Sequence, residues 1–169
     1  MRRVVVTGTG VVTPIGLNRK HFWENLVDGK SGITSVESLD VSNYPSRIAG
    51  EIKNFDPTEY MEKRESKRVD RFTQLGVAAA VQAWQDAGLN DQLLDKDNIG
   101  VLIGSGIGGI RTIEDQLRIL DQKGPRRVSP FLVPALIANM ASGYISILFK
   151  LRGPNTTVVT ACASSTHAI

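Results

Sequence analysis

The residues of this chain best suited to covalent chemistry surround its single cysteine, Cys162. Residues 156–160 are mostly β-branched and predict a buried strand, and the small residues after them predict a sharp turn into a helix. A thiol at such an elbow is open to a substrate, and the N–H groups at a helix start favour a thiolate and can donate to an oxyanion. A lone cysteine is more often inert and buried, so the elbow pattern alone leaves both interpretations open.

His167 is the nearest candidate for a base that would activate this thiol. A residue five positions along a helix lies roughly 140° around the axis, so imidazole and thiol would not face each other. His21, the other histidine, is expected on a helix surface or as a satisfied core side chain. The sequence therefore offers a nucleophile without a visible base.

A second candidate site is the glycine-rich segment 104–109, Gly-Ser-Gly-Ile-Gly-Gly. It lies between a predicted strand and a predicted helix, which is the context of a dinucleotide-binding loop. That fingerprint needs an acidic residue at the end of the next strand, whereas here the corresponding region is helical and ends at Asp121. We expect these small residues to let the turn pass close to backbone or ligand, with a nicotinamide-dependent oxidoreductase as the remote alternative.

The elements that position these residues alternate between strand-like and helix-like patterns, which favours an α/β architecture. The helix before residue 88 has an alanine-rich second half, whose small side chains let another backbone approach closely. Asn18 is a suitable cap for an earlier helix, and Gly29 a suitable stop. Strands are predicted over residues 3–7, 47–52, 99–103 and 156–160, and helices over 18–29, 56–59, 66–87, 110–120 and 134–149.

Length and composition narrow the classes of protein that this chain can belong to. Its 169 residues are 41% hydrophobic and 22% charged, which excludes disordered, collagen-like and coiled-coil proteins. One cysteine and two histidines exclude a disulfide framework and argue against a zinc cluster. The net charge of +3 is too small to indicate a nucleic-acid partner, and no uninterrupted apolar stretch reaches the roughly 20 residues of a membrane span. We expect one cytoplasmic domain over residues 1–169.

Several segments, in the same order, resemble the β-ketoacyl-[acyl-carrier-protein] synthases, and the type II elongating enzymes most closely. Residues 160–165, Thr-Ala-Cys-Ala-Ser-Ser, are similar to the active-site signature of that family. Residues 104–109 resemble its glycine-rich segment. The resemblance covers the whole chain, with further matching segments at residues 3–10, 13–16, 129–134, 139–140 and 151–154.

This resemblance implies a thiolase-like fold, α-β-α-β-α in the complete enzyme, of which the chain would form most of the N-terminal half. Cys162 would accept an acyl chain from an acyl carrier protein, and its own N–H would contribute to the oxyanion hole. Decarboxylative Claisen condensation with a malonyl carrier protein would then extend the chain by two carbons, as in fatty-acid elongation. No cofactor would be bound, because phosphopantetheine arrives on the carrier protein.

The resemblance also implies roles for side chains outside the elbow. Ile107, Phe131 and Leu132 would line the acyl pocket, and the stretch from Phe131 would lie near the interface of a homodimer. Five basic residues would dock the acidic carrier protein: Arg64, Lys67, Arg68, Arg126 and Arg127. Without the resemblance, the first three would read as a solvated helix face, because acidic residues interleave them.

The family's catalytic histidines, its lysine and its gating loop lie beyond the position of Ile169. We therefore expect this chain to be the first part of a longer enzyme, and to be inactive in condensation by itself. One alternative is a non-catalytic partner of the same fold that binds carrier protein or sets chain length, although such partners typically lack the nucleophilic cysteine. Another is a thiolase or starter-type ketosynthase acting on coenzyme A thioesters, which the Thr-Ala-Cys-Ala-Ser-Ser context matches less well.

Overall fold

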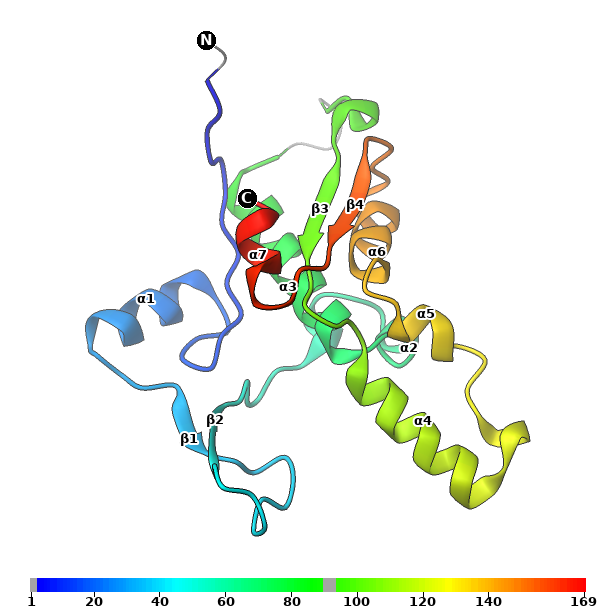
Figure 1. Ribbon diagram of the computed structural model, residues 1–169. Helices are drawn as coiled ribbons and strands as arrows, with labels where there is room; N and C mark the ends of the chain where they lie inside the picture. Colours follow the sequence, from blue (N-terminus) through cyan, green and yellow to red (C-terminus); the bar gives the residue numbers. More distant parts are fainter. Residues whose placement is uncertain (1–2, 90–93) are drawn as a thin grey trace. The chain divides into compact units, whose positions relative to one another are not determined.

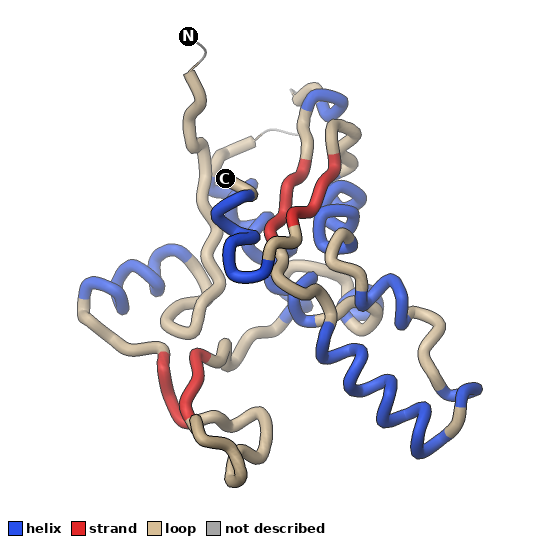
Figure 2. Tube along the Cα trace, in the orientation of Figure 1, coloured by secondary structure: helices blue, strands red, loops and turns tan. Residues whose placement is uncertain are grey.

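The computed structural model describes residues 3–89 and 94–169, and these divide into two compact units (Figure 1). The first unit contains residues 3–56 and 78–89, and the second contains residues 57–77 and 94–169. Helix α3, Arg71–Asp86, contributes its first half to the second unit and its second half to the first. Each unit combines helices with a two-stranded sheet, which confirms the predicted α/β class (Figure 2).

The first unit contains helix α1 and an antiparallel strand pair. The side chain of Asn18 accepts the His21 N–H at 2.9 Å, so this helix has the predicted cap. It ends just before Gly29, whose φ of +68° lies in the left-handed region that favours glycine. The strand predicted near residues 47–52 is confirmed as β2. The bounds are α1 Arg19–Val27, β1 Ile33–Ser35 and β2 Ile48–Gly50.

The strand predicted over residues 3–7 is wrong. The segment is not part of a sheet, and Val4 and Val6 are 94% and 84% exposed. β-branched side chains favour extended backbone, but a strand also needs a neighbouring strand to bond with. No strand within the described residues pairs with this segment.

The backbone that follows packs against the alanine-rich half of α3, as predicted for a small-residue helix face. A Cβ on Gly8 would lie 2.3 Å from the carbonyl oxygen of Ala83, and one on Gly10 would lie 1.9 Å from that of Ala79. Real side chains never approach so closely, so only glycine fits at these two positions. The close approach brings residues 8–11 within hydrogen-bonding reach of the helix.

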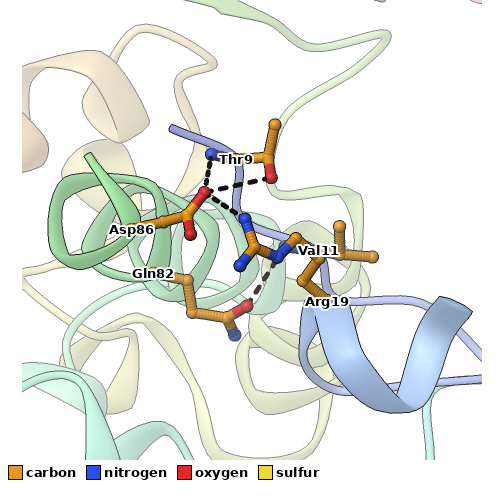
Figure 3. A network of polar contacts seen from close by, with 5 residues as sticks. All are labelled: Thr9, Val11, Arg19, Gln82 and Asp86. Carbon is orange, nitrogen blue, oxygen red and sulfur yellow. Dashed lines mark hydrogen bonds and ion pairs between the residues drawn. The ribbon is translucent and has the colours of Figure 1, made fainter. Parts of the chain in front are cut away.

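Polar side chains at the end of α3 hold this segment in place (Figure 3). The Asp86 carboxylate accepts the Thr9 N–H at 2.9 Å and forms an ion pair with Arg19 at the start of α1. The side-chain oxygen of Gln82 accepts the Val11 N–H at 3.1 Å. The Thr9 N–H, and then the charge of Arg19, hold the pKa of Asp86 below its ordinary value of 3.8. One carboxylate thus joins three segments of the first unit.

The second unit is centred on a parallel strand pair, β3 (Val101–Gly104) and β4 (Asn155–Val158), with Val101 opposite Asn155. Both strands were predicted, and each lies within two residues of its expected bounds. Helices α6 and α7 pack against this pair (Figures 1 and 2). The helices of this unit are α2 Lys63–Ser66, α4 Ile110–Lys123, α5 Leu132–Leu136, α6 Met140–Phe149 and α7 Ser164–His167, with 3-10 turns η1 Pro57–Glu59, η2 Lys96–Asn98, η3 Pro125–Arg127 and η4 Ala161–Ala163.

The single helix predicted over residues 66–87 is wrong in its first turn, because the chain breaks between α2 and α3. Asp70 is only 8% exposed, and its carboxylate accepts the Phe72 N–H at 3.3 Å. The same carboxylate accepts the N–H and the hydroxyl of Thr112 at the start of α4, at 2.9 and 2.6 Å. A side chain that accepts from an amide two residues ahead starts a new helix, so Asp70 begins α3 and also anchors α4.

The helix predicted over residues 134–149 is likewise two helices, α5 and α6. The Leu136 carbonyl accepts the Gly109 N–H at 2.8 Å, and Ile137 turns to an extended conformation with ψ of 134°. The Gly109 N–H therefore occupies the Leu136 carbonyl, which would otherwise accept a hydrogen bond from the next turn of α5. A tertiary contact ends this helix, and a local sequence pattern does not show it.

Because the pKa of Asp86 is lowered in the folded state, its carboxylate stabilises the protein above its ordinary pKa, and this contribution is lost as the pH falls through the lowered value. We expect Asp86→Asn to be less stable than the parent between about pH 5 and about pH 8, with the difference narrowing below about pH 4. Urea unfolding across this range measures it. Asp28→Asn is the control, since Asp28 is exposed and pairs only loosely with Lys30 at 3.5 Å. A difference that stays constant into acid would contradict the account.

Candidate active site

Cys162 lies on a sharp turn, four residues beyond the end of β4. The 3-10 turn η4 contains it, and helix α7 begins at Ser164. The residue is exposed, so the alternative of a buried cysteine is wrong. The elbow thus lies where it was predicted, although its first turn is 3-10 and the α-helix starts two residues later.

The backbone amide of Cys162 is available beside its sulfur. The neighbouring amides are occupied, because the Ala163 N–H donates to the Thr160 carbonyl at 3.1 Å and the Ser164 N–H donates to the Ala161 carbonyl. The Cys162 N–H donates no hydrogen bond to any atom of the described residues. It is therefore free to donate to an oxyanion that forms on a carbonyl attacked by the sulfur.

The residue before the cysteine is strained. Ala161 has φ of +50°, a left-handed conformation that costs a residue with a side chain about 1–2 kcal/mol. Such a conformation persists only where its surroundings impose it. Here the Ser164 hydroxyl accepts the Thr160 N–H at 2.9 Å and donates to the Ala161 carbonyl at 2.7 Å. One hydroxyl, in a residue that is 2% exposed, bonds the backbone on both sides of the strained residue.

His167 has a partner other than the cysteine. Its Nδ1 atom lies 2.9 Å from the Thr160 hydroxyl oxygen, and no hydrogen bond joins it to Cys162 within the part of the chain that the structure describes. This contact agrees with the expectation that the imidazole does not serve as the base for the thiol. It links the end of the strand to helix α7.

The glycine-rich segment passes directly beside the elbow. A Cβ on Gly104 would lie 2.4 Å from the Ser164 carbonyl oxygen, and one on Gly106 would lie 3.4 Å from that of Ala161. Further along, Gly109 approaches the backbone of α5, with 2.4 Å between an added Cβ and the Ala135 carbonyl oxygen. Of the two roles expected for these glycines, the structure shows close approach to backbone. Nothing in this packing favours a dinucleotide.

Two of the three predicted pocket residues lie together. Phe131, which is 39% exposed, and Leu132 stand at the start of α5 and line a cleft of about 120 Å³. Ile107 is 65% exposed in the glycine-rich segment and does not line this cleft. The other lining residues are Lys67, Arg68, Val69, Thr112, Asp115, Gln116, Ser129 and Ala135.

The basic residues predicted to dock a carrier protein differ in their surroundings. The Arg68 guanidinium stacks on the Phe131 ring, 4.6 Å from its centroid, and forms an ion pair with Glu65 at 2.9 Å. It therefore joins the predicted docking surface to the predicted pocket. The other four are exposed and form no ion pair among the described residues: Arg64, Lys67, Arg126 and Arg127.

Two supporting residues were not singled out from the sequence. Asp70 had a usable signal, since aspartate is a preferred cap and Phe72 continues the helical pattern just after it. Ser164 had none beyond its small size and its place in the motif. Its two backbone partners are brought within reach only by the left-handed turn at Ala161.

The close contact between Gly104 and Ser164 leaves no room for a methyl group at residue 104, so adding one should destabilise the protein. Gly104→Ala places a side chain against backbone that cannot rotate away, so we expect a loss of about 1–3 kcal/mol in the free energy of unfolding. The matched control is Gly143→Ala within α6, where nothing lies within 4 Å of an added Cβ. That change should leave stability equal or raise it by up to about 1 kcal/mol. Equal urea midpoints for the two variants would show that the elbow does not pack as described.

Within residues 3–89 and 94–169, no helix combines the length and the apolar character that a bilayer span requires. The same residues contain no cluster of three or more histidine, cysteine, aspartate or glutamate side chains that could hold a metal ion.

Comparison with known proteins identifies the family. The whole chain, residues 1–169, matches the family described as Beta-ketoacyl synthase, N-terminal domain. It is 48% identical over 168 residues to 3-oxoacyl-[acyl-carrier-protein] synthase 2 of Synechocystis sp., and 47% identical to the protein of that name from Vibrio harveyi. Each match covers 99% of this chain and 40% of the relative. The chain thus spans about two fifths of the length of these curated relatives.

Solved structures show the same fold. A chain from the complex of a type II polyketide acyl-carrier protein with its ketosynthase superposes with a TM-score of 0.83 at 23% identity, covering 99% of this chain and 44% of that one. The ishigamide ketosynthase/chain length factor gives 0.81 at 28% identity, covering 94% and 40%. The thiolase-like fold expected from the sequence is therefore confirmed. This chain belongs to the β-ketoacyl synthase family, whose N-terminal domain it matches along its whole length.

Proposed function

We propose that the protein containing this chain is a 3-oxoacyl-[acyl-carrier-protein] synthase of fatty-acid elongation, and that Cys162 is its nucleophile. The observation that carries the proposal is an exposed thiol beside an unpartnered backbone N–H, on a turn held in a strained conformation. The names of the curated relatives support the same activity.

In the first half-reaction, the Cys162 sulfur attacks the carbonyl carbon of an acyl thioester. A sulfur–carbon bond forms, and the carbonyl electron pair moves onto the oxygen, where the Cys162 N–H donates to it. Collapse of this intermediate breaks the bond to the phosphopantetheine sulfur, which leaves and takes up the proton lost by the cysteine. Phosphopantetheine is therefore part of the substrate, carried by an acyl carrier protein, and needs no site of its own as a resident cofactor.

In the second half-reaction, the acyl-cysteine is the electrophile. A malonyl thioester on a second carrier protein loses CO₂, and the resulting carbanion attacks the acyl carbonyl. A carbon–carbon bond forms, the Cys162 sulfur leaves, and the product is a 3-oxoacyl chain longer by two carbons. The same N–H faces the oxyanion of this step, because the carbonyl under attack is again bonded to the sulfur.

The carrier protein would dock through the exposed basic residues. Arg126 and Arg127 lie on the short turn η3, and Arg64 and Lys67 lie on and just after α2. These four cations are free of ion pairs within the described residues, so an acidic partner can bind them without displacing an existing carboxylate. Arg68 would contribute less, because Glu65 and Phe131 already engage it.

The acyl pocket and a homodimer interface would share the region around α5. Phe131, Val133 and Ile137 are 39%, 60% and 38% exposed, an apolar surface that costs free energy while it faces water. Phe131 and Leu132 would form the end of the pocket, and Ile107, on the loop beside the elbow, would contact the chain nearer the sulfur. A lone free cysteine suits a reducing compartment, which is why the cytoplasm remains the proposed location.

The nucleophile assignment is tested by the mass of the intact protein. We expect incubation with a fatty acyl carrier protein to add one acyl group, and Cys162→Ala to abolish the addition. The reaction is to be run with the protein at its natural length. Parallel incubation with acyl-coenzyme A distinguishes a starter-type or thiolase-like enzyme, which would acylate from that donor in preference to the carrier protein.

Two results would contradict the proposal. An adduct of equal yield on Cys162→Ala would place the acyl group on another residue. Stable binding of acyl carrier protein without any adduct would indicate a non-catalytic partner that only binds the carrier protein or sets chain length.

The docking surface is tested by reversing charge at η3. We expect the double variant Arg126→Glu with Arg127→Glu to load acyl groups from the carrier protein at least about tenfold more slowly at low salt, and to lose the salt dependence of loading. The control reverses two exposed lysines of the first unit, Lys20 and Lys30, and makes the same change in net charge. Equal loading rates for the two double variants would remove η3 from the docking surface.

A further inference from the structure

We infer that Ser164 is a positioning residue for this reaction: its hydroxyl orients the peptide bond between Ala161 and Cys162, and thereby aims the Cys162 N–H at the acyl oxygen. The inference rests on the proposed role of Cys162 as nucleophile. The Ser164 hydroxyl bonds the backbone of Thr160 and Ala161, and it takes no part in the bonds that form or break during acyl transfer.

The planarity of the peptide bond fixes how its carbonyl and its N–H point relative to each other. The carbonyl of Ala161 and the N–H of Cys162 belong to one rigid trans peptide unit, so they point in opposite directions and rotate together. Ser164 bonds that carbonyl twice, through its hydroxyl at 2.7 Å and through its own N–H. A carbonyl fixed by two donors fixes the direction of the N–H on the other side of the same unit.

The second contact of the hydroxyl holds the other side of the strained residue. The Ser164 oxygen accepts the Thr160 N–H at 2.9 Å. The same atom therefore bonds one backbone group on each side of the N–Cα bond of Ala161, about which φ is measured. We call these two hydrogen bonds of the Ser164 hydroxyl the clamp. Without the clamp, Ala161 would relax from its φ of +50° toward the negative φ values that residues with a side chain prefer. The Cys162 N–H would turn with it.

Ser164 is itself tightly packed. It is 2% exposed, and its carbonyl lies so close to Gly104 that no Cβ fits between them. Gly104 is the last residue of β3 and is paired with Val158 of β4. The clamp is therefore anchored to the strand pair, and the sulfur projects from a turn whose geometry the sheet determines.

A positioning role for Ser164 can be distinguished from a merely structural role by comparing two reactions of the Cys162 thiol. Acyl transfer to the sulfur passes through an oxyanion and needs the aimed N–H, whereas alkylation by iodoacetamide displaces iodide at a saturated carbon and forms no oxyanion. Loss of the Ser164 hydroxyl should therefore slow acylation far more than alkylation. A variant that is merely less stable would show no such selectivity.

The experiment compares both rates at Cys162 in the parent, in Ser164→Ala and in Ser142→Ala, each at natural length. Ser142 is the matched control, because it is also buried, at 0% exposure, and its hydroxyl also makes two contacts, with the Asn139 carbonyl and the Thr157 hydroxyl. The acyl donor is p-nitrophenyl acetate, which needs no carrier protein, and the alkylating agent is iodoacetamide. Thermal unfolding midpoints are measured for all three proteins.

We expect Ser164→Ala to acylate about tenfold to a hundredfold more slowly than the parent while its alkylation rate changes less than about threefold. Ser142→Ala should keep both rates, with a similar fall in unfolding midpoint. Equal acylation by Ser164→Ala and the parent, a parallel fall of both rates, or a failure to fold that Ser142→Ala does not share would each overturn the inference. A parent that reacts with the ester but not with acyl carrier protein would refute the proposed function and leave this comparison valid.

Discussion

The site depends on one close contact, the approach of the Gly104 backbone to the carbonyl of Ser164. Through this contact the start of α7 packs directly on the end of β3, with no side chain between the two backbones. The contact fixes the position of Ser164, and the Ser164 hydroxyl in turn holds Ala161 in its left-handed conformation. The planar peptide between Ala161 and Cys162 is thereby fixed, and with it the direction of the Cys162 N–H. An exposed thiol with an oriented N–H beside it therefore follows from the packing of the described residues.

The elements around the elbow are also joined by hydrogen bonds and close contacts that involve the backbone. Asp70 caps α3 and bonds Thr112 at the start of α4, while Gly109 takes the Leu136 carbonyl and ends α5. The two ends of the glycine-rich segment are thus attached to different partners, the elbow at Gly104 and α5 at Gly109. Helix α5 and the elbow that carries Cys162 are consequently both packed against one short loop.

Much of this arrangement could be predicted from local pattern. The strands β3 and β4, helix α4, the cap at Asn18 and the place of Cys162 all follow from periodicity, turn residues and the motif. The break at Leu136 could not, because it depends on a hydrogen bond to Gly109, far along the chain. The break at Asp70 had a local signal, since aspartate is a preferred cap, but its bond to Thr112 did not. The segment over residues 3–7 has strand composition without a partner strand among the described residues, and composition cannot supply one. The clamp at Ser164 also escaped prediction, since it exists only once Ala161 has adopted φ of +50°.

In the proposed reaction, the Cys162 N–H receives the oxygen of the acyl group. A crystal structure of the acylated protein tests it most directly. We expect the thioester carbonyl oxygen to lie about 2.7–3.1 Å from the Cys162 nitrogen, with Ala161 still left-handed and the Ser164 hydroxyl still bonded to the Ala161 carbonyl. A thioester oxygen directed away from this amide, or an elbow in which Ala161 has relaxed to negative φ, would contradict it.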